Sequence, residues 1–433
     1  MQITLIQPRV GSSLVKGSMP PLAMGILARY TPPEYRLNFI DESVEEVPED
    51  LNTDLIAMSV TTLTAKRAYD LADRFRSRGI KVVMGGIHPT VMPEEALQHA
   101  DTVVKGIGEH IWPEVLADAA AGRLKKEYTG SNDQPLQGLI PDRSIYAGKK
   151  YAPVVPVQFG RGCQFACDFC SVHAVYGRKV KHRPVDEMLE EIASIKTKVL
   201  FMVDDNIQSY GTGTFELLRG LKKLKKKWFG QISVNAAHDL ELVKLLAASG
   251  CMGLIIGFES VDEQNLLQMG KKVNIKHDYI RAIKNLQRHG IMVTGSFVFG
   301  YDFDNEITVR KALDFAERYH FVHAYFNPLV PTPGTGLYDR IKAEERFTEP
   351  TWWLSDSFRY GSLPFTPKGA TTAELEKACI NARRRFDSYQ SMFKRGYSSK
   401  ANFFPFTNWF IFWLANIVYR REYRRKYNNK IFG

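Results

Sequence analysis

Cysteine is scarce in this chain, with 5 residues among 433, and so few cannot form a disulfide framework for a protein of this length. Long apolar runs are missing too, since no stretch reaches the roughly 18 residues of a membrane-spanning helix. No basic segment followed by an apolar stretch opens the chain, so we expect no signal peptide and a cytoplasmic location. A hydrophobic content of 44% with 24% charged residues excludes a disordered chain.

An excess of charge is also missing from most of the chain. The formal net charge of +11 comes from 58 basic and 47 acidic residues. Residues 377–433 hold 13 of the basic and 2 of the acidic residues, so residues 1–376 are electrically balanced. A balanced body argues against nucleic-acid binding. The basic excess instead indicates a local role for the C-terminal segment.

Short apolar runs alternate with helical patterns in two stretches, which is typical of α/β folds with parallel sheets. The first stretch is residues 1–125, and a linker rich in glycine and proline follows at 126–153. The second stretch, residues 154–340, has six strand-helix units and predicts a complete or partial TIM-type barrel. Residues 341–433 predict a mostly helical extension, aromatic and basic. The six runs of the second stretch are Val154–Phe159, Val199–Val203, Ile232–Asn235, Leu254–Gly257, Val293–Phe299 and His323–Asn327.

Small and hydroxylated residues follow the apolar runs of the first stretch. Ligands of open parallel sheets bind beyond the carboxyl ends of the strands, and short side chains let the backbone approach a large ligand closely. These positions predict a ligand site, and the alternative is that the glycines only make tight turns. The positions are Ser59, Thr61, Thr62, Thr64, Gly85, Gly86, His88, Gly106, Gly108 and Glu109.

Three of the cysteines, Cys163, Cys167 and Cys170, directly follow the first run of the second stretch. Three thiolates on one loop can bind three irons of a four-iron four-sulfur cluster and leave the fourth iron open to a small chelating molecule. Zinc is the main alternative, but a structural zinc site needs a fourth ligand, and His173 is the only nearby candidate. We therefore predict an iron-sulfur cluster on this loop.

The spacing Cys-x-x-x-Cys-x-Phe-Cys, with Phe169 as the aromatic residue, resembles the signature of radical S-adenosylmethionine (SAM) enzymes. The resemblance implies that SAM chelates the open iron. It also implies that reduction cleaves SAM to a 5′-deoxyadenosyl radical, which abstracts hydrogen from an unreactive position. Such enzymes require an electron donor such as flavodoxin or ferredoxin, which the resemblance adds as a partner.

Polar residues at the ends of later runs match positions at which radical SAM enzymes bind SAM. A carboxylate that faces the SAM ammonium group is also physically sensible, although a solvated loop charge is the alternative for each one alone. Asp204 to Asn206 match the amine site, Asn235 matches a ribose or carboxylate contact, and Glu259 a further contact. The resemblance thus assigns to SAM the residues Phe169, Asp204, Asp205, Asn206, Asn235, Glu259 and Ser260.

The first stretch resembles the cobalamin-binding domain, Rossmann-like in fold, that precedes the barrel in a large radical SAM subgroup. This resemblance implies cobalamin as a cofactor and assigns to it the ten residues from Ser59 to Glu109 named above. No Asp-x-His-x-x-Gly sequence occurs, so none of the 10 histidines is marked as a lower axial cobalt ligand. Some members of the subgroup carry the domain without using cobalamin, so the motif predicts the fold more strongly than the cofactor.

The two resemblances together imply methyl transfer to an unactivated carbon. Radical cyclisation, dehydration or oxidation without methyl transfer is the first alternative, and a non-catalytic cobalamin or redox sensor is the second. The aromatic residues of the C-terminal segment suggest a large apolar substrate, such as a polyprenoid lipid or a tetrapyrrole. A sugar or peptide intermediate of a natural-product pathway is the alternative.

Residues 403–419 are uncharged and rich in Phe and Trp, and the basic run Arg420–Lys426 follows. The stretch is shorter than the about 20 residues that span a bilayer. An aromatic segment with a basic flank is typical of a helix that lies in a membrane interface, and a helix docked on the barrel is the alternative. The run Arg383–Arg385 predicts a solvated helix face, with a phosphate or carboxylate contact as its alternative.

Overall fold

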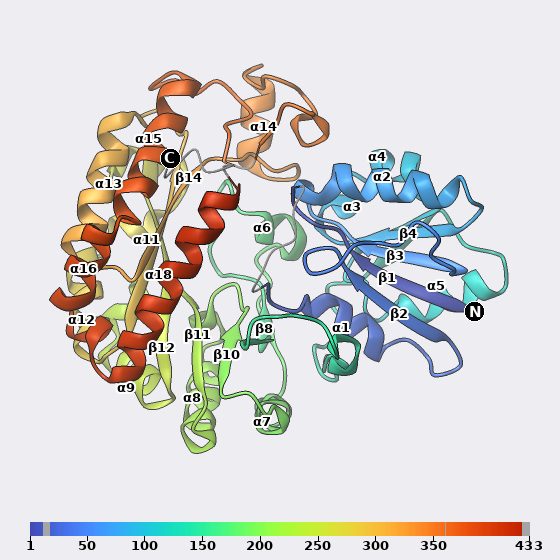
Figure 1. Ribbon diagram of the computed structural model, residues 1–433, viewed down its shortest axis with the longest axis horizontal. Coiled ribbons are helices and arrows are strands. Elements are labelled where there is room, and N and C mark those ends of the chain that lie inside the picture. Colours follow the sequence, from blue (N-terminus) through green and yellow to red (C-terminus); the bar gives the residue numbers. More distant parts are fainter. Residues whose placement is uncertain (12–17, 360, 427–433) are drawn as a thin grey trace.

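The computed structural model describes residues 1–11, 18–359 and 361–426. It contains two six-stranded sheets, and every strand pair within each of them is parallel. Figure 1 shows the two sheets next to each other, the first in blue and the second in green and yellow. The predicted α/β class, with one parallel-sheet unit after the other, is confirmed.

The first sheet has the strand order β2-β1-β3-β4-β5-β6. Alternate residues of β3 enter different cores: Ile56 and Met58 pack with α2 and α4, whereas Leu55 and Ala57 pack with α1 and α5. Helices therefore cover both faces, as buried parallel strands require. The elements are β1 Gln2–Gln7, α1 Leu22–Arg29, β2 Arg36–Asp41, β3 Leu55–Ser59, α2 Ala65–Arg76, β4 Lys81–Gly85, α3 Ile87–Val91, α4 Pro93–His99, β5 Thr102–Gly106, α5 Trp112–Ala120 and β6 Glu127–Gly130.

Strand β6 lies inside the segment predicted as a linker, residues 126–153. It pairs in parallel with β5 over Val103–Gly106, and Tyr128 at its centre is buried in the core on the α1 and α5 side. A single apolar side chain in a polar stretch leaves too weak a periodic signal to predict a strand.

The second sheet has the order β14-β13-β12-β11-β10-β7, so neighbours in space are also successive large strands of the chain. β7 and β14 are its two edges, and the sheet is an open, partial barrel. The elements are β7 Val155–Val157, β8 Gly160–Arg161, α6 Ser171–Tyr176, β9 Lys181–His182, α7 Val185–Ser194, β10 Val199–Met202, α8 Thr212–Leu224, β11 Lys227–Ile232, α9 Leu240–Ala248, β12 Cys251–Glu259, α10 Glu263–Gln268, α11 Lys272–Ile275, α12 Tyr279–Arg288, β13 Met292–Phe299, α13 Glu306–Arg318 and β14 His323–Pro328.

The third predicted strand of this series was placed wrongly, at residues 232–235. β11 ends at Ile232, and residues 234–238 form a 3₁₀ turn. The strand alternates exposed or half-buried residues such as Lys227 and Gln231 with buried ones such as Trp228. This half-polar alternation concealed the strand from a search for continuous apolar runs.

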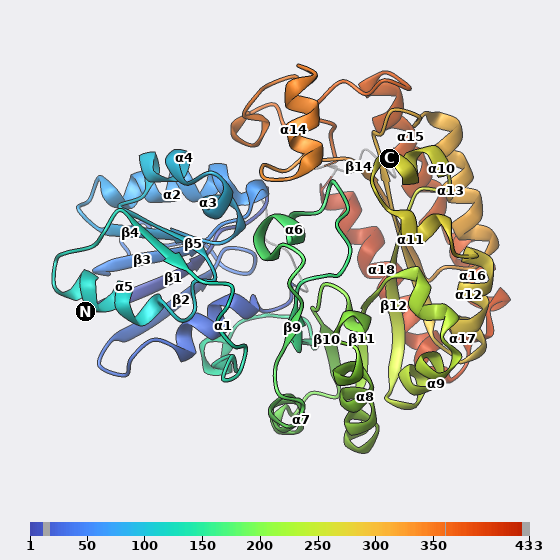
Figure 2. The ribbon, with the colours of Figure 1, turned by 180° about the vertical axis from the view of Figure 1, so that it is seen from behind.

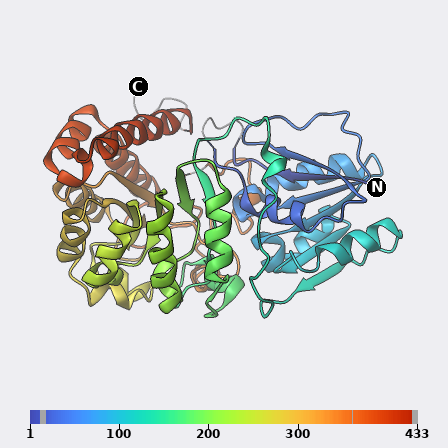
Figure 3. The same ribbon diagram turned by 90° about the horizontal axis from the view of Figure 1, so that it is seen from below.

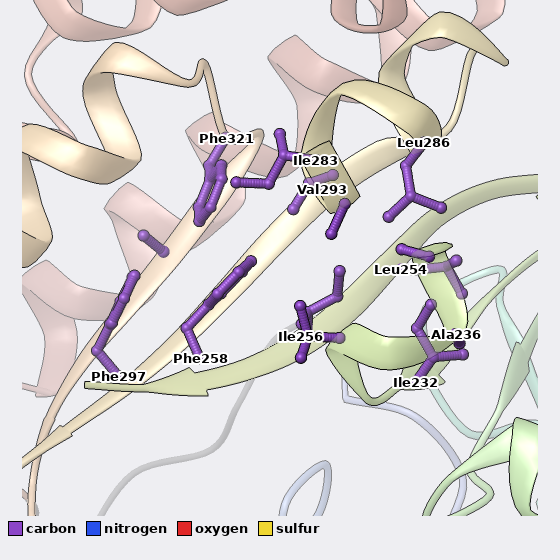
Figure 4. Packing of buried hydrophobic residues seen from close by; sticks show 14 of the residues in the cluster. Ile232, Ala236, Leu254, Ile256, Phe258, Ile283, Leu286, Val293, Phe297 and Phe321 are labelled. Carbon is purple, nitrogen blue, oxygen red and sulfur yellow. The ribbon is translucent and has the colours of Figure 1, made fainter. Parts of the chain in front are cut away.

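The main core of the second unit lies between the sheet and its outer helices, and Figure 4 shows part of it. The Phe258 and Phe297 rings stack 5.8 Å apart, and Phe258 and Phe321 are 5.3 Å apart. On β13 the buried Val293 and Phe297 point to this core. The intervening Thr294 and Ser296 therefore point to the opposite, inner face of the sheet.

The C-terminal extension contacts both units. Trp352 and Trp353 are buried in the core of the first unit beside α2 and α4, and Trp353 Nε1 donates to Glu95 Oε1 at 3.0 Å. α15 packs against α13 and β14 of the second unit. The elements of this extension are α14 Gly336–Ala343, α15 Thr372–Phe386, α16 Tyr389–Ser398, α17 Lys400–Phe403 and α18 Phe406–Lys426.

Helix α18 packs on the inner face of the second sheet. Its Phe412 is buried against Met252, Met292 and Val322 at the beginnings of β12, β13 and the strand after it. Viewed from below, the red C-terminal helix and the green helices lie on opposite sides of this unit (Figure 3). The interpretation of residues 403–419 as a docked helix thus agrees with the structure. No helix in the described ranges is both long and apolar enough to cross a membrane. Of the basic run Arg420–Lys426, the side chains beyond Arg421 lie outside the described part.

Candidate functional site

The cysteine loop lies between β8 and α6, just beyond the carboxyl end of β7. Cys163, Cys167 and Cys170 are half-buried and free of disulfides. Burial raises the pKa of Cys167 to about 12, while the charge of Lys271 opposes the rise and the thiols of Cys170 and Cys163 add to it. The three thiols therefore belong to one electrostatic group. A bound metal would reverse the rise in the thiol pKa, because a metal deprotonates its coordinating thiols.

Among the described side chains, no three His, Cys, Asp or Glu groups lie close enough to share one metal ion. A four-iron cluster does not need this arrangement, because each of the three thiolates binds a different iron. Three thiols on one short loop are a donor set that fits such a cluster.

Three consecutive residues after β10 hold the backbone of the cysteine loop. The buried Asp204 carboxylate accepts the Gly160 amide at 2.6 Å and the Phe159 amide at 3.3 Å. Asp205 accepts the Gly162 amide at 2.8 Å. Asn206 Nδ2 lies 3.8 Å from Cys163 Sγ, to which it donates. Each residue thus supports the next part of the loop.

This geometry sharpens the assignment of Asp204, Asp205 and Asn206 to SAM. Asp204 is fully buried, and burial raises its pKa to about 6 despite its two amide bonds. Its carboxylate is bonded to backbone amides just before the loop. Asp205 is only half-buried, so it is the member of the three that retains exposed surface for a ligand. Contact of these residues with SAM stays a prediction.

The middle of the cysteine loop is held from the far edge of the barrel. The Asp168 carboxylate accepts a short hydrogen bond from the Tyr301 hydroxyl, and Arg340 Nη2 donates to it at 3.4 Å. The Asp168 amide donates to the Met269 carbonyl at 3.2 Å. Hydrogen bonds therefore fix the loop on both sides, which restricts movement of the cysteines relative to one another.

Lys271 is a functional candidate that sequence reasoning missed. Its buried ammonium group bonds to Glu259 Oε1 and lies 6.0 Å from the centre of the Phe169 ring. Burial lowers the pKa of Lys271, but the charge and hydrogen bond of Glu259 and the nearby thiols of Cys167 and Cys170 together outweigh burial, so the pKa lies above its usual value. A buried cation beside the thiols fits the carboxylate of a small chelating molecule. No motif marks this lysine, which follows a glycine in a polar loop.

Asn235 and Ser260, also assigned to SAM, have other partners in the structure. Asn235 Oδ1 accepts Gln208 Nε2 at 3.0 Å, on the 3₁₀ turn at 234–238. Ser260 is buried, and its hydroxyl accepts the Asp262 amide at 3.0 Å. The structure brings Phe169, Asp205, Asn206 and Glu259 around the cysteine loop but turns the Ser260 side chain to its own backbone.

A cavity of about 260 Å³ lies between the two units at the carboxyl ends of the first sheet. It is lined by Ser59, Gly85, Gly86, Gly106, Gly108 and Glu109, and by Gln158, Arg161 and Tyr176 of the second unit. Gly86 and Gly106 have φ of 105° and 70°, and a Cβ atom there would lie 2.7 Å from Val60 O and 2.4 Å from Gly130 O. Only glycine fits this wall. The glycine wall and the apolar lining of this cavity fit part of a ligand as large as cobalamin.

Four of the ten residues assigned to cobalamin are not in this cavity wall. Thr61 and Thr64 cap the 3₁₀ turn at 62–64 with their side chains. His88 is fully buried, with its ring nitrogens 3.3 Å from Thr62 Oγ1 and 3.0 Å from Glu95 Oε1. The physical reason is that α3 turns His88 away from the cavity, toward the core under α2 and α4. Thr90, missed from the sequence, lines the cavity instead and accepts the Gly106 amide at 3.0 Å.

An ion pair joins the two units at the cavity. Arg161 Nη2 donates to Glu109 Oε1 at 2.6 Å, and both side chains are largely buried. Burial alone would raise the pKa of Glu109, but the charge and hydrogen bond of Arg161 hold it below its usual value. Figure 2 shows α6, which follows the cysteine loop, close to α3 of the first unit. Cavity and cysteine loop are therefore neighbours.

A second pocket, of about 220 Å³, lies beside Phe169. Its walls include Leu63 of the first unit, Val298 and Asn327 at the ends of β13 and β14, Phe358 and Arg383. Arg383 is buried, and its Nη2 donates to Asn327 Oδ1 at 2.8 Å. The expectation that residues 383–385 form one solvated face is therefore wrong for Arg383, which α15 turns toward the sheet. Arg385 pairs with Asp314 and Glu317 at the surface.

Comparisons with known proteins agree with this architecture. A family model described as the radical SAM superfamily matches residues 157–316, and a B12-binding-domain model matches residues 9–116. The chain is 31% identical to the bacteriochlorophyllide d C-12(1)-methyltransferase of Chlorobaculum tepidum, over 96% of this chain and 93% of that protein. It is 28% identical to the C-8(2)-methyltransferase of the same organism, over 76% and 78%.

The fold also matches a solved structure. The radical S-adenosylmethionine methyltransferase TsrM of Kitasatospora setae superposes with a TM-score of 0.66 at 16% identity, over 79% of this chain and 76% of that one. At this identity the likeness concerns the fold alone: a first parallel-sheet unit followed by a partial barrel.

Proposed function

The chain belongs to the radical SAM superfamily, among the members that carry a B12-binding domain before the barrel, and from this premise we propose that it methylates an unactivated carbon of a large hydrophobic molecule. A four-iron four-sulfur cluster, SAM and cobalamin are its cofactors. When bound, these groups supply the electron, the radical and the methyl group. The protein's own residues position them and exclude water.

The observation that carries the proposal is the adjacency of the two candidate cofactor sites. Arg161, two residues before Cys163, pairs with Glu109 in the wall of the glycine-lined cavity. A methyl group carried at the first sheet and hydrogen abstraction at the second require such proximity, because both act on one substrate carbon. Cys163, Cys167 and Cys170 would hold the cluster, with Glu259 and Lys271 beside the SAM that chelates it.

The pocket beside Phe169 suggests the class of substrate. Its walls are mostly apolar, and Arg383 contributes a buried guanidinium group. A guanidinium in an apolar wall suits a hydrophobic molecule with a carboxylate. Since the relative from Chlorobaculum tepidum is named for bacteriochlorophyllide d, we propose a tetrapyrrole of this class as substrate.

The proposal includes two further partners. One is a small electron-transfer protein such as a flavodoxin or ferredoxin, which would reduce the cluster. The other is a membrane surface, approached from the cytoplasm through the C-terminal segment with its basic excess. We propose no nucleic-acid partner, because the remaining 376 residues are electrically balanced.

Anaerobic reconstitution tests the reaction. The protein is loaded with iron, sulfide and cobalamin, reduced with dithionite, and given SAM and a bacteriochlorophyllide. We expect a product heavier by one methylene group, together with S-adenosylhomocysteine and 5′-deoxyadenosine, and none of these from Cys167→Ala. If 5′-deoxyadenosine forms with an altered substrate of unchanged carbon number, the reaction is a radical rearrangement or oxidation. An intact cluster without SAM cleavage would mean a sensor.

A further inference from the structure

Helix α18 exposes a row of large apolar side chains and buries two asparagines. The row that faces the sheet is Asn408, Phe412 and Asn416, and all three are buried. The outward row is spaced by four residues and forms one continuous stripe along the helix. It consists of Phe406, Phe410, Leu414 and Val418, with exposed fractions of 71%, 56%, 50% and 41%.

The buried polar row is what docks the helix. Asn408 Nδ2 donates to the Gly290 carbonyl at 3.0 Å, and Asn416 Nδ2 donates to the Val322 carbonyl at 3.1 Å. Arg395 of α16, fully buried, donates to the same Val322 carbonyl at 2.9 Å and to Asn416 Oδ1 at 3.2 Å. The outward row takes no part in these contacts, so packing within the chain gives no reason for its apolar character.

The stripe continues onto the neighbouring helix. The Phe393 ring of α16 lies 4.9 Å from that of Trp413, and the Tyr397 ring lies 6.2 Å from that of Phe403. Phe393, Tyr397, Phe403 and Phe404 are each about half exposed or more. In Figure 1 α16 is at the edge of the second unit farthest from the first, and α18 is the red helix that runs across the front of this unit. We call these four residues and the outward row of α18 the aromatic face.

Exposed positive charge lies on the same helices as the aromatic face. Residues 389–421 contain no Asp or Glu, and Lys394, Lys400 and Arg421 are exposed. The Lys400 ammonium lies 5.8 Å from the centre of the Phe404 ring. Two copies of this face would bring like charges together in a symmetric dimer, which opposes self-association. Anionic lipid headgroups complement both features, since aromatic rings favour the bilayer interface and basic side chains favour its negative surface.

We propose that the aromatic face lies in the interface of an anionic lipid bilayer, with α18 parallel to the membrane surface and docked on the barrel at the same time. The inference rests on the membrane contact proposed above and identifies its surface. The helix thereby combines the two interpretations of residues 403–419: its Asn row binds the protein, and its outward row binds lipid. The enzyme is held at the surface from which a hydrophobic substrate is taken.

Vesicle flotation of the reconstituted full-length protein tests this inference. We expect the protein to float with phosphatidylglycerol vesicles, and at least tenfold less with phosphatidylcholine vesicles or at high salt. Phe410→Ser with Leu414→Ser should reduce flotation at least tenfold without changing the melting temperature or SAM cleavage. The matched control is Leu267→Ser with Ile307→Ser, which removes two equally exposed apolar side chains elsewhere and should float like the wild type.

Three results would overturn the inference. The first is a wild type that does not float with phosphatidylglycerol vesicles, and the second is an equal loss in the control variant. The third is a protein that sediments as a dimer without lipid and becomes monomeric with Phe410→Ser and Leu414→Ser, which would assign the face to a second copy. Methyl transfer is assayed separately with soluble substrate: activity without flotation refutes only the membrane face, and flotation without methyl transfer refutes only the proposed reaction.

Discussion

The two parallel sheets present different kinds of surface at their carboxyl ends. The first sheet offers backbone and glycine: Gly86 and Gly106 line its cavity, and the titratable His88 points into the core. The second offers thiols on a chain segment that carboxylates fix: Asp204 and Asp205 accept backbone amides, and Asp168 accepts the Tyr301 hydroxyl. Similar architecture thus supports two opposite ways of building a site.

The difference matches the physical demands of the two cofactors. A large ligand held by its surface requires room and close backbone approach, which side chains would obstruct. A metal cluster requires ionised donors, and ionised donors in a half-buried loop require neighbours that fix and compensate them. Substitutions that change charge should therefore damage the second site, and substitutions that change shape should damage the first.

Removal of the thiols is the largest expected effect. Replacing Cys163, Cys167 and Cys170 by Ala should lower the iron content and the absorbance near about 400 nm to background, because no other thiol lies on the loop. Cobalamin binding at the first sheet should be unchanged. Iron analysis and absorbance spectra measure both, and loss of cobalamin with the iron would show that the two sites are not independent.

Lys271→Met should destabilise the protein by about 3–5 kcal/mol, because it leaves the buried Glu259 carboxylate without its partner. Urea unfolding measures the change. Adding Glu259→Gln should restore most of the lost stability. Lys81→Met is the control, since its exposed pair with Asp101 should contribute no more than about 1 kcal/mol. Equal effects of Lys271→Met and Lys81→Met would contradict the charge-based account of the second site.

Gly106→Ala tests the shape-based account of the first site, with Gly122→Ala as its matched control. The two glycines have φ of 70° and 68°, but only at Gly106 does a Cβ atom meet a neighbour, 2.4 Å from Gly130 O. Both variants should lose about 1–2 kcal/mol of stability, because alanine is strained in the left-handed region. Gly106→Ala should lose about 2 kcal/mol more through the clash of its Cβ atom. Cobalamin affinity should fall with Gly106→Ala alone. Unfolding measurements and cobalamin titration check both effects. Equal stability and equal cobalamin affinity of the two variants would refute the shape-based account of the first site.

The pH dependence should differ between the sheets by about 1–2 kcal/mol. Burial raises the pKa of Asp204 to about 6 and that of Asp304, in the loop between β13 and α13, to about 7. In the unfolded chain these carboxyls are already ionised above about pH 4. Between about pH 4 and these values, the two carboxyls are protonated in the folded protein and ionised in the unfolded chain. The stability that protonation contributes is lost as the pH rises through 6 and 7.

The first unit should not show this fall. The pKa values of Glu95 and Glu109 lie below their usual range, so their stabilisation is complete above about pH 4.5 and is lost only in acid. Hydrogen exchange by mass spectrometry at pH 5.5 and 7.5, corrected for intrinsic rates, compares the two sheets in one molecule. A parallel decrease in both would refute the difference.

The sequence predicted well what depends on local pattern. Continuous apolar runs marked most strands, and three thiols at a fixed spacing marked the cluster loop. It predicted poorly what depends on the direction in which a side chain points. His88 and Thr90 are neighbours in one glycine-rich segment, yet only the turn of α3 decides which one lines the cavity. Arg383 and Arg385 are equally charged, and only the packing of α15 buries one of them.

Contacts between residues far apart along the chain also could not be predicted from the sequence. Lys271 gains its importance from Glu259 and the cysteine loop, and no spacing rule connects them. Asp204 was correctly placed at a strand end, but whether its carboxylate faces a ligand or a neighbouring backbone depends on the pairing of β10 with β7. Positions at strand ends are thus predictable, whereas the orientation of their side chains requires the assembled sheet.

The support of the cysteine loop by Asp204, Asp205 and Asn206 also bears on how the enzyme matures. The contacts join segments only 43–45 residues apart on two adjacent strands, so the pairing of β7 and β10 brings their partners together. Small metal-folded domains are unfolded until the ion binds. Here the chain's own hydrogen bonds support the loop, and we expect the iron-sulfur donor of the cell to meet a folded loop rather than a chain that must fold around the cluster.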